Sequence, residues 1–137
     1  MPYEELPHTA DLCLRVWAAD MAHLFTEAAR GMNSLAGYRL ADKPRVRRTF
    51  STSAVDTESL LVSFLSELVY YAEQDRLAFD HFDLSFDLET GLPFHLSASL
   101  SGAPILSLDK NIKAVTYHNL QIRPTARGYT TEIVFDV

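Results

Sequence analysis

The sequence contains a single cysteine, Cys13, among its 137 residues. One thiol cannot form an internal disulfide, so the fold must depend on a hydrophobic core. The low cysteine content also suits a reducing compartment. A chain of this length can bury such a core as one domain. Glycine and proline are also scarce, at five and six residues, and there is no low-complexity tract. We therefore expect one compact domain over residues 1–137.

Long hydrophobic runs are absent as well. Residues 1–5 are acidic and contain no apolar stretch, so they do not resemble a signal peptide. The longest mostly apolar stretch, residues 60–72, is too short and too polar to span a bilayer. The sequence therefore indicates a cytoplasmic protein without a membrane partner.

Acidic residues outnumber basic residues, and the formal net charge is −6. This balance argues against broad, non-specific binding to phosphate backbones. The basic cluster Arg45–Arg48 is a candidate anchor for RNA phosphates, but the acidic total favours its interpretation as a solvated face. Linear motifs for phosphate loops, zinc sites and serine hydrolases are also missing. Cys13 as a nucleophile is disfavoured, because a thiol inside an apolar strand is usually buried and inert.

Apolar periodicity indicates an α+β fold. Helical spacing predicts one helix between Asp20 and Gly37, and a longer helix over residues 57–75 capped by Asp56. Alternation of apolar and polar residues predicts strands over residues 12–18, 46–53, 79–88, 94–100, 112–123 and 129–137. The late strands are joined by short turns, which favours antiparallel pairing. We expect two helices packed on one face of a mainly antiparallel β-sheet.

Two carboxylates lie at opposite ends of the chain. Asp136 belongs to the last predicted strand, and Asp11 directly precedes the first. If these strands are neighbours, both carboxylates meet at one end of the sheet. Calcium favours carboxylate, carbonyl and water oxygens without a local motif, and the terminal oxygen of Val137 can add a ligand. In the alternative interpretation, Asp11 caps a turn and Asp136 is a solvated residue at a strand end.

The segment Ile112–His118 is the other unusual stretch. Lys113 in such a strand can present a positive charge to a phosphate or to a partner's carboxylate. It can equally be an edge-strand lysine that discourages aggregation. His118 is a candidate ligand or proton carrier, although a single histidine in a strand is more often a hydrogen-bonded structural residue.

Four segments together resemble one family. They are His8–Asp11, Ser66–Tyr70, Ile112–His118 and Phe135–Val137, and they occur in the same order and at the same places as in the archease family. The resemblance covers the whole chain.

The resemblance implies an accessory protein, not an enzyme in its own right. Archeases activate an RtcB-type RNA ligase in tRNA splicing and RNA repair by promoting ligase guanylylation and multiple turnover. RNA is then contacted indirectly, through the ligase. The family binds a divalent cation, typically calcium, through residues that correspond to Asp11, Asp136 and Val137, and in this chain we expect calcium, with magnesium or manganese as alternatives. Lys113 is implied to be functional, in reaching the ligase active site.

The loop before Ile112 departs from the family pattern. Archeases commonly carry a longer, often histidine-bearing loop there, whereas residues 104–111 are short and contain no histidine. Asp109 is a candidate substitute oxygen donor. Two other functions stay open: a chaperone-like modulator of an RNA or DNA methyltransferase, and a hydrolase that uses a cation at Asp11 and Asp136 to activate water. The absence of a clear base beside either carboxylate argues against the hydrolase.

Overall fold

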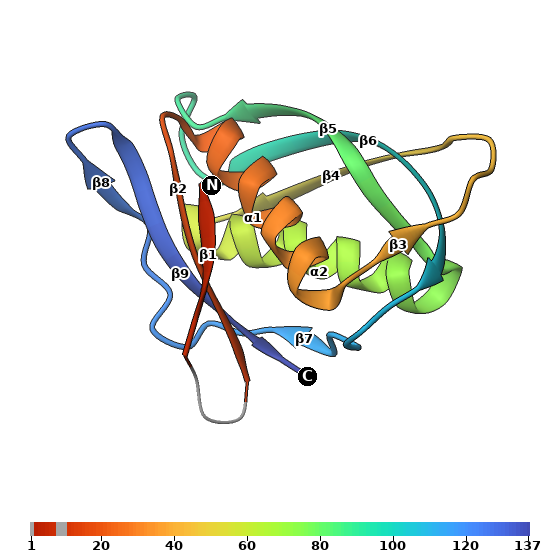
Figure 1. Cartoon of the computed structure of the whole chain (residues 1–137). Coiled ribbons are helices and arrows are strands. Elements are labelled where there is room, and N and C mark those ends of the chain that lie inside the picture. The colour runs from red at the N-terminus through yellow and green to blue at the C-terminus, as the bar shows by residue number, and fades with distance from the viewer. Residues whose placement is uncertain (1, 8–10) are drawn as a thin grey trace.

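A computed structural model describes residues 2–7 and 11–137. The predicted α+β class is confirmed (Figure 1). In chain order the elements are β1 (Tyr3–Leu6), β2 (Leu12–Ala18), α1 (Met21–Ala36), β3 (Arg39–Leu40), β4 (Val46–Ala54), α2 (Thr57–Asp75), β5 (Leu77–Asp87), β6 (Phe94–Ser107), β7 (Ala114–Val115), β8 (Arg123–Thr125) and β9 (Gly128–Asp136).

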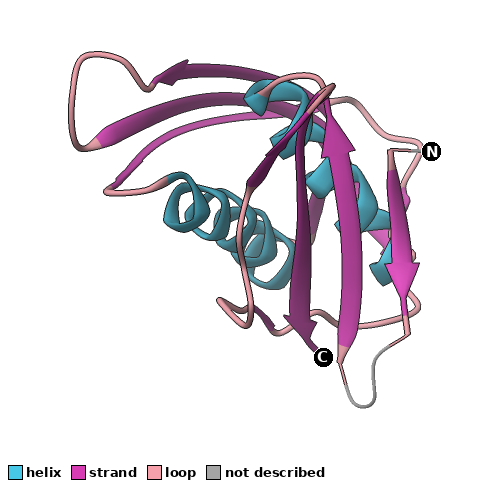
Figure 2. Ribbon diagram, turned by 90° about the vertical axis from the view of Figure 1, so that its left-hand side faces the viewer, coloured by secondary structure: helices cyan, strands magenta, loops and turns pink. Residues whose placement is uncertain are grey.

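The strands form two antiparallel sheets where one was expected. The first has the order β1-β2-β9-β7, with β8 also paired to β9. In the second, β6 pairs with β3, β4 and β5. The split arises because β9 pairs with β2, near the start of the chain, and not with β6. Helix α1 contacts strands of both sheets, and α2 contacts β4, β5 and β6 as well as β7. Figure 2 shows the helices in the angle between the sheets.

Both helices begin where local signals predict, and α1 also ends at its predicted glycine. The carboxylate of Asp20 accepts a hydrogen bond from the backbone N–H of His23 at 2.8 Å, and that of Asp56 accepts from Ser59 N–H at 2.6 Å. Such caps satisfy donors that the first turn of a helix leaves open. Helix α1 ends at Gly37, whose φ of 67° is the left-handed conformation that glycine adopts without strain. Within the described ranges, no helix is long and apolar enough to cross a membrane.

The two helices and the two sheets share one hydrophobic core. Phe25 of α1 and Phe64 of α2 are fully buried, with ring centroids 5.6 Å apart. Phe25 also packs edge-to-face on Phe86 of β5, at 4.9 Å. From the first sheet, Phe135 and Leu14 reach the same cluster with no exposed surface. Because one core joins all layers, the first sheet is held rigidly against the rest of the protein.

The predicted strand over residues 112–123 was wrong except at Ala114–Val115, which form β7, and at Arg123, where β8 begins. Only Ala114 and Val115 pair with the C-terminal end of β9, and the chain leaves the sheet until β8 begins. The reason lies in the burial pattern: Ile112, Val115 and Leu120 are all buried, at spacings of three and five residues that a strand of period two cannot provide. The predicted hairpin between this segment and the last strand is confirmed as β8–β9.

The acidic N-cap of α1 makes stability depend on pH. The backbone N–H of His23, and then its ring, lowers the pKa of Asp20 below its ordinary value of 3.8. We expect Asp20→Ala to lower the free energy of unfolding at pH 7 by about 1 kcal/mol, and Asp20→Asn to lower it less, because asparagine also caps. The carboxylate's contribution is fully present above the unfolded pKa and is lost as pH falls through the lower folded pKa. The advantage of the unmodified protein over the Asp20→Asn variant should therefore disappear in acid.

Urea denaturation at pH 7 and near pH 3 measures both effects. Asp42→Ala is the matched control, because Asp42 is an exposed carboxylate in the turn before β4. A loss for Asp20→Ala no greater than for Asp42→Ala would contradict the role of the cap.

Candidate functional site

The pairing of β2 with β9 brings the two ends of the chain together. Leu12 lies opposite Phe135, and Cys13 lies opposite Val134. Continuing this antiparallel register by one residue places Asp11 opposite Asp136. Opposed residues in such a pair have Cβ atoms about 5 Å apart. The sequence predicted that the two carboxylates meet if the first and last strands are neighbours. This condition is met, and Figure 2 shows the end of β9 beside the start of β2.

Strand alternation sends both carboxylates to the outer face of the first sheet. Leu12 and Phe135 point into the core and are 5% and 0% exposed. Their neighbours Asp11 and Asp136 therefore face outward, Asp11 half-buried and Asp136 exposed. Val137 is half-buried and packs its side chain against the core. Only main-chain oxygen of Val137 is thus available to a cation on the outer face.

Lys113 lies on the other side of Asp136. Its backbone N–H donates to the carbonyl oxygen of Asp136 at 2.8 Å, and Ala114 pairs with Asp136 in β7. The side chain of Lys113 is exposed. Asp11, Asp136 and Lys113 thus come from three adjacent segments at one end of the sheet, although the sequence had predicted this meeting only for the two carboxylates.

The donor set fits a hard divalent cation in part. Two carboxylates supply up to four oxygens, and calcium completes its shell with carbonyl oxygens and water. No group of three or more His, Cys, Asp and Glu side chains in the described part of the chain could hold a metal ion. A cation between Asp11 and Asp136 must therefore use main-chain oxygens and water as well. The first three residues of the predicted His8–Asp11 motif lie outside the described residues.

Neither Cys13 nor the basic cluster Arg45–Arg48 requires a functional site to explain its surroundings. Cys13 is 6% exposed, and burial raises the pKa of its thiol, so the reactive thiolate is disfavoured. The guanidinium of Arg45 binds Asp80, and its hydrogen bonds, followed by its charge, lower the pKa of that carboxyl. The cluster is therefore partly neutralised within the protein, as the acidic composition suggested.

Asp109 and His118 lie in connecting segments. The two carboxylate oxygens of Asp109 accept hydrogen bonds from Arg39 at 3.1 and 3.4 Å, beside the end of α1. Asp109 is therefore already paired with a cationic side chain. His118 is not in a strand but in the loop between β7 and β8, where its Nε2 lies 3.4 Å from Asn119 Nδ2.

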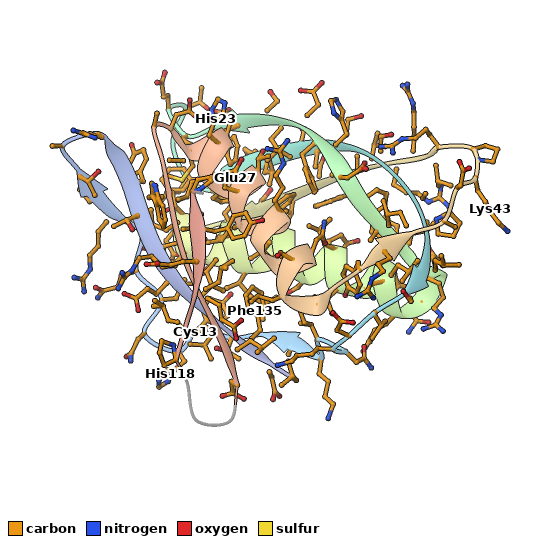
Figure 3. The ribbon with its side chains drawn as sticks, viewed as in Figure 1. Cys13, His23, Glu27, Lys43, His118 and Phe135 are labelled. Atoms are coloured by element: carbon orange, nitrogen blue, oxygen red, sulfur yellow. The ribbon has the colours of Figure 1, made fainter. Side chains whose placement is uncertain are left out.

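Sequence reasoning missed a pocket of roughly 510 Å³ on the same outer face. Cys13 and Val134, the next outward residues after the carboxylate pair, belong to its lining, as does His118, which Figure 3 draws near Cys13. The outward positions of the strands were readable from alternation. The course of the loop that forms the other wall was not.

Comparison with known proteins agrees with this architecture. The model of the Archease protein family (MTH1598/TM1083) matches residues 3–137. The chain belongs to the archease family. The archease of Methanosarcina barkeri is 34% identical over 140 aligned residues, which cover 98% of this chain and 95% of that protein. The archease of Methanopyrus kandleri is 29% identical over 141 aligned residues, which cover 100% of this chain and of that protein.

Two solved structures share the archease fold. Protein 1598 of Methanobacterium thermoautotrophicum superposes with a TM-score of 0.79 at 22% identity, over 99% of both chains. An archease of Thermotoga maritima, described as a possible chaperone, superposes with a TM-score of 0.69 at 19% identity, over 98% of this chain and 96% of its own. At these identities the likeness establishes the fold alone.

The opposed carboxylates should repel each other when no cation is bound. We expect Asp136→Asn to raise the free energy of unfolding in EDTA by roughly 0.2–1 kcal/mol, since like charges directly opposite in a sheet are destabilising. The gain should shrink at high salt, because exposed charges are screened. Urea denaturation at low and high ionic strength measures it, with Asp42→Asn as the control.

A double-mutant cycle with Asp11→Asn isolates the pair. In the Asp136→Asn variant, the further change Asp11→Asn should raise the free energy of unfolding only slightly. Fully additive effects of the two changes would contradict the proximity of the carboxylates.

Proposed function

We propose that this archease-family protein is a divalent-metal-binding accessory protein that activates an RtcB-type RNA ligase. The single observation that supports the metal site most is the register of β2 against β9, which opposes Asp11 and Asp136. Calcium is the preferred cation, because carboxylate and main-chain oxygens are its usual ligands. Magnesium and manganese share this preference for oxygen and are tested beside it.

Each residue of the proposed site has a separate task. Asp11 and Asp136 bind the cation from two neighbouring strands. Val137 keeps its main-chain oxygen near them, because its side chain is fixed against the core. The bound cation supplies a concentrated positive charge at the exposed end of the sheet. Lys113 adds an ammonium group beside it, on the segment just before β7 that its N–H ties to Asp136.

This arrangement suits an activator that acts on phosphates held by another protein. A cation and an ammonium group can offset the charge that develops during phosphoryl or nucleotidyl transfer. Ligase guanylylation is such a transfer, and the site is exposed enough to be presented to a partner. RNA, whether spliced tRNA or damaged RNA, is then served through the ligase, which is consistent with the acidic charge of −6.

A second candidate function rests on one relative. The Thermotoga maritima archease is described as a possible chaperone. A chaperone-like modulator of an RNA or DNA methyltransferase is the corresponding role here. Co-purification separates the two: recovery of an RtcB-type ligase supports the activator, and recovery of a methyltransferase supports the modulator.

The metal site predicts a stabilisation by calcium. At a calcium concentration of 100 times Kd, the free energy of unfolding should rise by about 2.7 kcal/mol, since the cation binds the folded state. Thermal denaturation with calcium, magnesium or manganese against EDTA measures the effect. Asp11→Asn and Asp136→Asn should abolish it, whereas Asp42→Asn should retain it. Equal stabilisation of Asp136→Asn would exclude Asp136 as a ligand.

The activator role predicts distinct losses for the carboxylates and the lysine. With purified ligase and a catalytic amount of this protein, the unmodified chain should restore repeated turnover. Asp11→Ala and Asp136→Ala should fail through loss of the cation. Lys113→Ala should fail while keeping calcium stabilisation, because Lys113 contributes charge and not a ligand. Full turnover with either aspartate variant would sink the proposed role of the metal.

A further inference from the structure

The pocket on the outer face of the first sheet exists because the ladder of β9 is interrupted. Strand β8 pairs with Gly128–Thr130, and β7 pairs with Phe135 and Asp136. Between these two stretches, residues 131–134 have no ladder partner in β7 or β8. The chain between the two short strands stands off as a loop and leaves a pocket of roughly 510 Å³ against the outward side chains of β2 and β9. This volume lies in the range of small-ligand sites.

The loop wall is fixed in place. At its start, the hydroxyl of Thr116 donates to the carbonyl of Val134 at 2.9 Å. At its end, the hydroxyl of buried Thr131 donates to the carbonyl of Gln121 at 2.8 Å, and Ile122 N–H donates to Glu58 of α2 at 2.9 Å. The pocket is therefore preformed, so a ligand would not have to order the loop.

Two guanidinium groups reach the pocket, and they differ in their partners. Arg15 forms ion pairs with Glu4 at 3.0 Å and with Glu132 at 3.6 Å. Arg123 instead donates two hydrogen bonds, at 2.6 and 3.1 Å, to the neutral side chain of Gln121. Within residues 2–7 and 11–137, Arg123 takes part in no ion pair. Its charge is thus available to an anion, and a guanidinium binds phosphate oxygens in bidentate fashion.

The remaining lining suits a base more than a simple anion. The side-chain amide of Asn119 carries a donor and an acceptor together, as the edge of a nucleobase does, and the amide of Gln121, whose oxygen already accepts from Arg123, offers its N–H donors. The imidazole of His118 is a planar ring on which a base can stack. Cys13 and Val134, each 6% exposed, provide a small apolar floor. The guanidinium of Arg123, together with two amides, an imidazole ring and an apolar floor, suits a nucleoside monophosphate.

We propose that this pocket binds a nucleoside monophosphate unit, with its phosphate on Arg123 and its base against Asn119, Gln121 and His118. The unit can be a free nucleotide or the phosphate-bearing end of an RNA strand. The proposal does not depend on the metal site or on a ligase. The two sites nevertheless adjoin, since Cys13 and Val134 lie two residues, or about 7 Å, from the carboxylate pair along their strands.

Calorimetric titration of the isolated protein in EDTA tests the site. Nucleoside monophosphates should bind, and the matching nucleosides and inorganic phosphate should each bind at least tenfold more weakly. Arg123→Gln should lower nucleotide affinity at least tenfold and leave nucleoside affinity unchanged. Glu132→Gln should raise nucleotide affinity, because it removes a carboxylate from the pocket and releases Arg15. Arg127→Gln, an exposed arginine of the same hairpin outside the pocket, is the control and should have no effect.

Short RNA strands distinguish the two sources. If an RNA end is the ligand, an oligoribonucleotide with a terminal phosphate binds more tightly than the mononucleotide, and the same strand with hydroxyl ends does not. If a free nucleotide is the ligand, the mononucleotide binds at least as tightly as the strand. Inorganic phosphate that binds as well as the nucleotide, an equal loss with Arg127→Gln, or no nucleotide binding at millimolar concentration overturns the proposal.

Discussion

The pairing of β2 with β9 is the interaction on which the rest of the structure depends. It joins Leu12–Ala18 near the start of the chain to Tyr129–Phe135 at its end. On its inner face Leu14, Val16 and Ile133 are fully buried against the helices. Without this pairing the first sheet would lose its centre, because β1 pairs only with β2 and the strands β7 and β8 pair only with β9. The same ladder carries the opposed carboxylates and the floor of the pocket.

The core fixes the geometry of the outer face through the register. A shift of β2 by one residue would turn Leu12 to solvent and bury Asp11, and the same shift of β9 would expose Phe135 and bury Asp136. Such a shift would expose apolar surface and bury carboxylates, both of which cost free energy. The positions of the carboxylates are therefore determined by hydrophobic contacts on the opposite side of the sheet. The same two strands therefore carry the candidate site residues on their outer face and core residues on their inner face.

Local signals explain what could be predicted from the sequence. Asp20, Gly37 and Asp56 define the helix ends because capping acts within one turn, and alternation located most of the strands. The division into two sheets was not predictable in this way, because it depends on pairing across more than 100 residues, which leaves no local pattern. Short β1 and β3 carry too few residues for alternation. The juxtaposition of Asp11 and Asp136 was predictable only as a condition on strand order.

The proposed cation would link occupancy of the outer face to the stability of the first sheet. Two carboxylates opposed at the open end of the ladder weaken the pairing there while they remain uncompensated. A bound cation would reverse this repulsion and draw β2 and β9 together at that end. Because the floor of the pocket lies on the next pair of outward residues, Cys13 and Val134, the change would extend toward it through the same ladder. If both proposals hold, occupation of one site would therefore strengthen the scaffold of the other.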